Sequence, residues 1–278
     1  MSVDMWTLIL RTPDAGDVEL RPDSPTKFWA DPFLIPGTDG RGMMAEEFDY
    51  RTNLGQIVEL ALDDSYKVLS VTPSFPSNRH QSYPFTVDYD GTLYLIAEMS
   101  DRGLVPLFKR TTSGWEEQEP LLADFAGLDS TLVVDETGAL WLCTSPLSDP
   151  DRLEVFGATE LGGPWTHHAT LAQGTRGSRS AGRPWRDESG QWIRPAQDGS
   201  ERYGGGVVLK AVAADWKSES AHSQLPVPTG FEGLHTIDCL DGFEIVDAVS
   251  RRSITTRHEF VRWRAQDLRR RASSRLSR

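Results

Sequence analysis

Ala30-Asp31-Pro32-Phe33 is the first of five copies of one short phrase, and this repeat decides the fold. The later copies are Ser82-Tyr83-Pro84-Phe85, Leu128-Asp129-Ser130-Thr131, Gly182-Arg183-Pro184-Trp185 and Leu234-His235-Thr236-Ile237. Their second residues follow one another at intervals of 52, 46, 54 and 52 residues. A repeat of roughly 50 residues with several strands in each unit is typical of the blades of a β-propeller.

Each copy is followed within six to eight residues by a glycine-containing turn and then by a second apolar stretch, such as Leu93-Tyr94-Leu95-Ile96. Five such units account for most of the 278 residues. We therefore predict an all-β chain that forms one five-bladed β-propeller over residues 1–262 and ends in a short Arg-rich tail over residues 263–278. The segment 6–10 precedes the first unit, and we predict that it closes the ring as the fourth strand of the last blade.

Charge is unevenly distributed along the chain. The whole chain has 29 basic and 41 acidic side chains, a net charge of −12, whereas residues 251–278 hold ten Arg and two acids, a net charge of +8. The first 250 residues therefore carry −12 − 8 = −20. Such an acidic body repels phosphate backbones, so nucleic acid is not an expected partner. The basic tail is interpreted as solvated or as lying on the acidic body.

The sequence shows no sign of membrane insertion or secretion. No apolar run is long enough to span a bilayer, and the N-terminus lacks the basic start and apolar stretch of a signal peptide. Cys143 and Cys239 lie in different apolar segments, which favours buried thiols over a disulfide. We therefore expect a cytoplasmic protein without a membrane partner.

Equivalent positions in the blades of a propeller surround its central channel. The second residues of the five copies should therefore form one ring, which consists of Asp31, Tyr83, Asp129, Arg183 and His235. Fifteen residues after the first four of them come Glu46, Glu98, Thr144 and Asp198, which the returning second strand brings toward the same face. With His80, these side chains predict an axial pocket rich in acidic and basic groups.

Paired carboxylates in one pocket suit glycoside chemistry, in which one protonated acid assists the leaving oxygen and another activates water or attacks the sugar. Asp31 is the predicted base or nucleophile, and Asp129 would orient it or tune its pKa. The candidate catalytic residues are Asp31, Glu98, Asp129 and Asp198. The candidate substrate-binding residues are Glu46, His80, Tyr83, Arg183 and His235. No residues have the spacing of a metal site, and no cofactor is expected.

The segment Phe28–Leu34 resembles the first-blade motif of five-bladed glycosidases of the arabinanase, β-xylosidase and invertase type, and Leu128–Leu132 resembles their second conserved Asp. A closer resemblance is to the propeller domain at the N-terminus of glucosamine inositolphosphorylceramide transferases and its bacterial relatives. It covers roughly residues 25–250 and rests on Glu46–Tyr50, His80–Phe85, Ser180–Pro184, Arg194–Asp198 and Tyr203–Gly205. The resemblance adds Gln197 to the substrate-binding set and implies an axial cation or a water near His235.

One departure from the glycosidase pattern lies at the start of blade four. The resemblance implies a Glu there as general acid, but this chain reads Ser180-Ala181-Gly182-Arg183. An arginine does not release its proton at working pH. Either Glu98 or Asp198 supplies the proton, or the pocket does other chemistry in which Arg183 binds an anionic group.

We predict a glycosidase-related enzyme that acts on a sugar or sugar-like small molecule. Two alternatives stay open at this point. One is a non-hydrolytic tailoring enzyme of small-metabolite biosynthesis, such as a lyase or cyclase. The other is a carbohydrate-binding module without catalysis.

Overall fold

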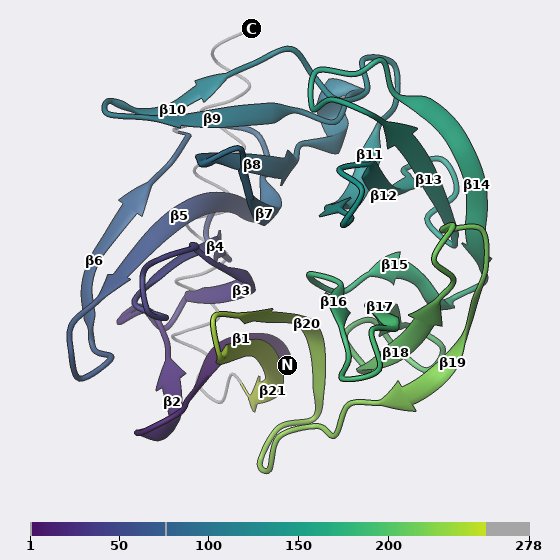
Figure 1. Cartoon of the computed structure of the whole chain (residues 1–278). Helices are drawn as coiled ribbons and strands as arrows, with labels where there is room; N and C mark the ends of the chain where they lie inside the picture. Colours follow the sequence, from purple (N-terminus) through teal and green to yellow (C-terminus); the bar gives the residue numbers. More distant parts are fainter. Residues whose placement is uncertain (1, 76, 254–278) are drawn as a thin grey trace, which may run out of the picture.

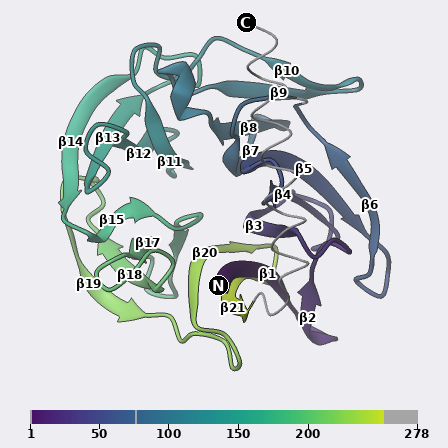
Figure 2. The ribbon, with the colours of Figure 1, turned by 180° about the vertical axis from the view of Figure 1, so that it is seen from behind.

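Five antiparallel sheets surround one central axis in the computed structural model, which describes residues 2–75 and 77–253 (Figure 1). The view from behind shows the same ring of sheets (Figure 2). Within the described residues the only helical element is the short 3-10 helix η1 (Ser100–Arg102). The predicted all-β, five-bladed propeller is therefore confirmed. The predicted Arg-rich tail lies outside the described residues.

The strands follow one another from the axis outward in the first four blades. Blade one consists of β3 (Lys27–Leu34), β4 (Gly42–Asp49), β5 (Leu54–Leu62) and β6 (Val68–Pro73). Blade two consists of β7 (Ser82–Tyr89), β8 (Thr92–Glu98), β9 (Leu107–Thr111) and β10 (Gly114–Glu117). Blade three consists of β11 (Gly127–Val134), β12 (Leu140–Pro146), β13 (Arg152–Ala158) and β14 (Thr166–Gln173). Blade four consists of β15 (Arg176–Ser180), β17 (Trp192–Asp198), β18 (Gly206–Val212) and β19 (Glu219–Gln224), with the short β16 (Trp185–Arg186) also paired to β17.

The fifth blade joins the two ends of the described chain. Its order from the axis is β20 (Gly233–Leu240), β21 (Phe243–Ser253), β1 (Ser2–Thr12) and β2 (Gly16–Leu20). The N-terminal segment was predicted as the fourth strand, but β1 is the third, and it pairs with β21 from Ser2↔Ser253 to Arg11↔Glu244. The prediction counted one strand before blade one, whereas the chain turns back after Thr12 and adds β2 as the outermost strand. The domain limits stay a prediction.

Burial falls from the axis outward. The inner strands β3, β7 and β11 are buried along nearly their whole length, because neighbouring blades pack on both of their faces. The outermost strand of blade one, β6, is exposed throughout. Apolar clusters lie between successive blades; one of them joins Phe33 of blade one, Phe85 of blade two and Leu132 of blade three. This interblade packing holds the inner strands, and hence their polar side chains, in place.

The repeated phrase is a bulge in the innermost strand. The pairing of first and second strands shifts register at Ala30/Phe33, Ser82/Phe85, Leu128/Thr131 and Leu234/Ile237. At three of these bulges the second residue has a positive φ: 49° for Asp31, 46° for Tyr83 and 47° for Asp129. A bulge interrupts the alternation of side chains between the two faces of a strand and turns one of them in a new direction. In blades one, two, three and five the phrase therefore marks the point where the inner strand turns one side chain at the axis.

No helix in the described part of the chain has the length and apolarity that a bilayer crossing requires.

Candidate functional site

A cavity of about 310 Å³ lies where all five blades meet. Its lining residues are Trp6, Phe28, Ala30, Asp31, Glu46, Phe48, His80, Ser82, Glu98, Asp129, Arg179, Tyr203 and His235. Larger hollows lie elsewhere, one of about 870 Å³ beside β2 and β6 and one of about 660 Å³ beside η1. Each of these two is formed by at most two neighbouring blades. The axial cavity is the candidate site because it alone among them gathers acids from three blades.

Most of the site residues predicted from the sequence come together at this cavity. Six of the ten line it, namely Asp31, Glu46, His80, Glu98, Asp129 and His235. Tyr83 and Gln197 are buried directly behind the lining and contact it through hydrogen bonds. Arg183 and Asp198 lie outside it. The roles assigned to these residues stay predictions.

Asp31 is a buried carboxylate with several donors around it. His235 Nδ1 lies 3.1 Å from its Oδ1, and the hydroxyl of Thr236 donates to the same oxygen at 2.9 Å. The backbone N–H of Tyr83 donates to Oδ2 at 3.2 Å. Burial alone would raise the pKa of Asp31, but the charge and hydrogen bond of His235, with the other two donors, lower it below its ordinary value. Asp31 is therefore ionised at neutral pH.

His235 is held between two carboxylates. Its Nδ1 faces Asp31 and, at 3.5 Å, Asp247, which also accepts the backbone N–H groups of His235 and Thr236. Burial alone would lower the pKa of His235, but these two acids raise it well above the usual range. Its Nε2 is buried without a hydrogen-bond partner among the described residues.

Asp31, His235 and Asp247 each offer one ligand atom, and these atoms lie within 4.8 Å of one another. Neutral imidazole is the form that binds a metal ion. The raised pKa of His235 instead favours the imidazolium, which already supplies the positive charge between the two carboxylates. The axial cation or water near His235 stays a prediction.

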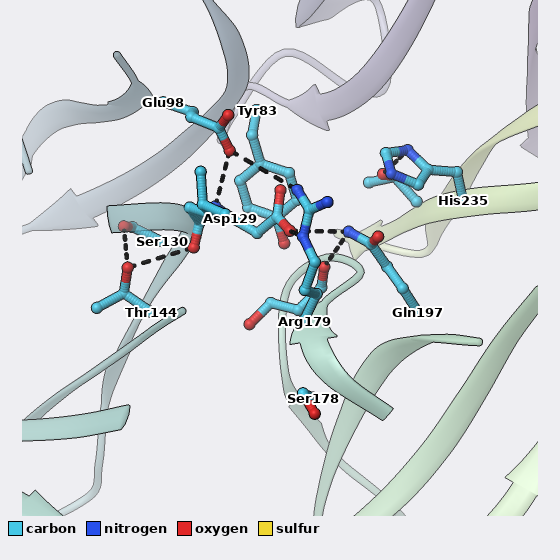
Figure 3. Close-up of polar contacts among 12 residues, drawn as sticks. Tyr83, Glu98, Asp129, Ser130, Thr144, Ser178, Arg179, Gln197 and His235 are labelled. Atoms are coloured by element: carbon cyan, nitrogen blue, oxygen red, sulfur yellow. Dashed lines mark hydrogen bonds and ion pairs between the residues drawn. The ribbon is translucent and has the colours of Figure 1, made fainter. Parts of the chain in front are cut away.

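The opposite side of the cavity is organised around Asp129 (Figure 3). Its Oδ2 accepts Nε of Arg179 at 2.6 Å and Nε2 of Gln197 at 2.9 Å. Its backbone N–H donates to Oε2 of Glu98 at 3.1 Å. Burial alone would lower the pKa of Arg179, but Asp129 raises it above its ordinary range, so the guanidinium is always charged. Arg179, whose side chain is partly exposed, and the buried Asp129 thus form one ion pair in the wall.

Glu46 and Glu98 behave differently from the two aspartates. Burial, together with the charges of Asp31 and Asp247, raises the pKa of Glu46 well above its ordinary value, although His235 lowers it. Burial and the charge of Asp129 raise the pKa of Glu98 to about 8, although Arg179 lowers it. Both glutamates are therefore protonated at neutral pH. The cavity holds neutral carboxylic acids beside ionised carboxylates.

Arg183 was predicted to enter the axial pocket, and the structure places it elsewhere. Its Nε donates to Asp238 at 2.8 Å, and its Nη1 donates to the backbone oxygen of Thr86 at 2.7 Å. The fourth copy of the phrase is irregular, because β15 ends at Ser180 and Gly182 is pressed against the backbone of Ile237. The side chain of Arg183 therefore bridges blades two and five instead of lining the cavity.

Asp198 was a candidate catalytic residue, and it also lies outside the cavity. Its carboxylate pairs with Arg176 at 3.0 Å and accepts the hydroxyl of Ser200 at 2.6 Å. Burial would raise the pKa of Asp198, but these contacts lower it. Asp198 is the last residue of β17, so its side chain organises the following turn rather than the axis.

Sequence reasoning missed Arg179, Tyr203 and Asp247. Arg179 lies four positions before the key residue of the irregular fourth copy, so the register of the repeat pointed to the wrong arginine. Tyr203 stands in the loop before β18 and is 63% exposed at the cavity. Asp247 is an acid in an apolar strand, twelve residues after His235, and this is a signal that could have marked it as buried and functional.

Comparison with known proteins gives both a sequence family and a structural class. The family described as "Glucosamine inositolphosphorylceramide transferase 1, N-terminal" matches residues 17–236. The chain is 29% identical over 219 residues to glucosamine inositolphosphorylceramide transferase 1 of Oryza sativa subsp. japonica, covering 75% of this chain and 29% of that protein. The Arabidopsis thaliana protein of the same name is 26% identical over 214 residues, covering 73% and 28%. The chain thus spans less than a third of the length of these relatives.

Solved structures of the same fold include sugar-cleaving enzymes. A β-xylosidase superposes with a TM-score of 0.58 at 10% identity, over 82% of this chain and 93% of that one. A GH43 β-xylosidase/α-arabinofuranosidase from a compost metagenome gives 0.56 at 9% identity, over 84% and 93%. At such low identity these likenesses establish the shared propeller fold.

Proposed function

The chain belongs to the glucosamine inositolphosphorylceramide transferase 1 N-terminal family, and from this premise we propose that its axial cavity binds a carbohydrate-type ligand and acts on it by glycosidase-related chemistry. The name of these relatives contains a sugar, glucosamine, and an inositol. Both are polyhydroxylated rings that need closely spaced donors and acceptors. The cavity offers such groups from all five blades.

The observation that carries this proposal is the division of the acids into two protonation states. Glu98, with a pKa of about 8, holds a proton at neutral pH, whereas Asp31 is ionised in the same cavity. Two carboxyl groups whose environments push their pKa values apart are the pattern of an acid and a base or nucleophile acting together. Glycoside cleavage needs one group of each kind.

The roles follow from these states. Glu98 would donate its proton to the leaving oxygen. Asp31 would face the anomeric carbon as nucleophile or stabilise the positive charge that develops there, since its lowered pKa makes it a weak proton acceptor. Asp129 would position the ligand and Glu98, because its backbone N–H already holds the Glu98 carboxyl group. Asp198 has no role in this scheme.

A second candidate is carbohydrate binding without turnover. It is favoured by the number of hydrogen bonds and ionic contacts that the carboxylates of Asp31 and Asp129 already make within the protein. Asp31 already accepts Thr236 and Tyr83 beside His235, and Asp129 already accepts Arg179 and Gln197. A carboxylate with so many donors has little basicity left.

The cytoplasm stays our proposed location, because the free thiols Cys143 and Cys239 suit a reducing compartment.

The test combines hydrolysis with binding. Purified protein is assayed on a panel of furanosides and pyranosides, each with an activated aryl and an unactivated alkyl leaving group. Glu98→Gln should lower turnover of alkyl glycosides about 10²-fold or more, with a smaller loss on aryl glycosides, which need less proton donation. The matched control is Glu188→Gln, an exposed glutamate.

Calorimetry with the same sugars separates the outcomes. Saturable binding without cleavage of any glycoside would replace the hydrolytic proposal by the binding module. Failure of every sugar to bind would remove both. Equal losses on alkyl and aryl substrates would leave the enzyme in place but take the acid role from Glu98.

A further inference from the structure

The innermost strand of blade four carries a wider bulge than that of blade one. β15 pairs with β17 at two positions that flank the bulge, so residues 177–179 stand opposite Gln197 alone. The bulge of blade one places two residues opposite one. Arg179 is the last residue of the wide bulge; its Nε donates to Asp129 at 2.6 Å, and its Nη2 lies 4.0 Å from Oε2 of Glu98 (Figure 3). The shape of this bulge therefore determines whether a cation stands in the wall of the cavity.

A buried arginine fills the gap that the bulge opens between β15 and β17. Arg194 of β17 is 0% exposed. Its Nη2 donates to the backbone oxygen of Gly177 at 2.6 Å, and its Nη1 donates to that of Ser178 at 3.4 Å. Because one residue of β17 faces three of β15, the strand ladder cannot satisfy these carbonyl groups, and the guanidinium takes its place. The bulge is thus held by a side chain.

Glu219 of β19 holds the Arg194 guanidinium in this orientation. Nε and Nη2 of Arg194 donate to the two carboxylate oxygens of Glu219 at 2.9 Å and 3.0 Å. The side chain of Glu219 is 6% exposed, and Nζ of Lys210 lies 3.9 Å from it. The desolvation of two buried charges offsets most of their attraction, so such a pair is weak evidence for stability. Its geometry instead aims the remaining N–H groups of Arg194 at the bulge.

We infer that Arg194, held by Glu219, is a positioning residue of the axial site: it fixes the bulge that directs Arg179 into the cavity, and through Arg179 it acts on Asp129 and Glu98. This inference rests on the proposed function for the role of Glu98 as proton donor. It adds two residues that lie behind the cavity wall and do not line the cavity. Without the guanidinium, the carbonyl groups of the bulge lose their donors and the segment that carries Arg179 relaxes.

The protonation of Glu98 reports the position of Arg179. Burial and the charge of Asp129 raise the pKa of Glu98, whereas the charge of Arg179 lowers it. Displacement of Arg179 from the wall should therefore raise this pKa further. The charged and titratable groups that surround Glu98 in the cavity lining, with Asp247 behind them, are Asp31, Glu46, His80, Asp129, Arg179, Tyr203 and His235.

The experiment measures the pKa of Glu98 by carbon-13 magnetic resonance of the full chain, with glutamate labelled at its carboxyl carbon. The spectrum of Glu98→Gln identifies the signal. The double variant Arg194→Met/Glu219→Met removes both buried charges together, so neither is left unpaired, and thermal unfolding shows that it is folded. We expect its Glu98 pKa to lie about one pH unit or more above the original value of about 8.

Two further variants separate positioning from charge. Arg194→Lys keeps the positive charge beside Glu219 but loses the planar fork that also reaches the bulge, so it should raise the Glu98 pKa as well. The matched control is Arg110→Met/Glu59→Met, which removes an ion pair between the outer parts of blades one and two, with donor and acceptor 3.1 Å apart. It should leave the Glu98 pKa unchanged.

A mutant cycle tests the route through Arg179. Arg179→Met alone should raise the Glu98 pKa, and adding Arg194→Met/Glu219→Met to it should give no further rise. A purely structural role would instead add its own effect in the Arg179→Met background. Such an additional rise would overturn the inference.

The same measurement gives the other contradicting results. An unchanged Glu98 pKa in the folded double variant would overturn the inference. If the double variant does not fold, an unchanged pKa in folded Arg194→Lys would overturn it.

Turnover tests the proposed function separately. Wherever a glycoside is cleaved, the loss of turnover at high pH should move upward with the Glu98 pKa in the variants, because the acid keeps its proton to a higher pH. Cleavage of no glycoside would remove the hydrolytic function, while the resonance measurement would still decide the role of Arg194.

Discussion

The second residue of the repeated phrase shows, in three blades, how one backbone conformation serves different purposes. Asp31, Tyr83 and Asp129 share a positive φ at the bulge of an inner strand. The two aspartates use it to present a carboxylate to the cavity. Tyr83 uses it to bury its ring, whose hydroxyl accepts the backbone N–H of Gly182 at 2.7 Å. The bulge determines that a side chain turns inward, and the residue type determines whether it provides charge or support.

The two arginines of blade four offer a matched test of site and scaffold. Arg179→Lys should weaken ligand binding about tenfold or more, because a lysine cannot reproduce the guanidinium contact with Asp129 inside the cavity. Arg183→Lys should leave binding unchanged but lower the melting temperature, because it loses one of the contacts to Asp238 and Thr86. Calorimetry and thermal unfolding of both variants check this. If Arg183→Lys bound the ligand more weakly while Arg179→Lys bound it normally, Arg183 and not Arg179 would belong to the binding site.

The raised pKa of Glu98 predicts how stability depends on pH. Its ordinary value is 4.5 and its folded value about 8, so between these values the folded state holds a proton that the unfolded state has lost. The contribution of Glu98 to the free energy of unfolding is fully present below pH 4.5 and is lost as the pH rises through 8. In the original chain this lowers the free energy of unfolding by on the order of a few kcal/mol between pH 5 and pH 8, and Glu98→Gln should abolish that decrease.

Denaturant unfolding at several pH values measures this effect. The curve of the variant should be flatter than that of the original chain without becoming level, since the pKa of Glu46 is raised for the same reason. Glu188→Gln serves as the control. Parallel curves for the original chain and Glu98→Gln would show that Glu98 is not protonated in the folded state.

At the scale of elements, the contact between blades four and five is unusually close. The backbones of Gly182 and Ile237 form a bridge, and Ile237 N donates to the oxygen of Ala181 at 2.8 Å. A Cβ at position 182 would lie 1.6 Å from the Ile237 oxygen, and the φ of Gly182 is +134°. Glycine is required here because no side chain fits between the two inner strands. This contact sets the distance between the elements that carry Arg179 and His235.

Gly182→Ala should therefore be strongly destabilising. We expect a loss of about 3 kcal/mol or more in the free energy of unfolding, from the backbone clash and the strained φ together. Gly162→Ala is the control, because a Cβ there meets nothing within 4 Å, and it should stay within about 0.5 kcal/mol. Chemical denaturation of both variants decides. A Gly182→Ala protein of unchanged stability would mean that the two blades are not in this contact.

At the scale of the whole molecule, closure of the ring depends on strands from opposite ends of the described chain. In the fifth blade β1 lies between β21 and β2 (Figure 1). It buries Trp6, Leu8, Ile9 and Leu10. Trp6 also lines the cavity, so closure and site share one element. A propeller without β1 would expose the edge of β21 and an apolar face of the last blade.

Deletion of residues 1–12 should abolish cooperative folding. Full burial of each large apolar side chain contributes about 1.5–3 kcal/mol, so the four in β1 together approach the typical stability of a domain, about 5–15 kcal/mol. Circular dichroism during thermal unfolding measures the loss, and addition of a peptide of residues 2–20 in trans should restore a transition. An unchanged melting temperature of the truncated chain would refute closure by β1.

The sequence by itself determined the number of blades, the inner strands of all blades except the fourth, and the approach of Asp31, Asp129 and His235 to the axis. It could do so because each of those four repeats carries its own turn and bulge, and these depend on neighbouring residues. The returning second strands brought Glu46 and Glu98 into the prediction for the same local reason. The order of the last blade could be predicted only in part, because β1 pairs with β21, more than 200 residues away, and β2 joins the blade only through β1.

Only the tertiary structure decided which groups complete the site and in which charge state. Arg179 enters the cavity and Arg183 leaves it because the fourth copy of the phrase is irregular and packs against blade five. The protonation of Glu46 and Glu98 depends on burial and on acids from other blades. Both depend on distances in space, which cannot be inferred from the spacing of residues along the chain. Local pattern thus specified the scaffold, whereas the electrostatics of the site emerged where the blades meet.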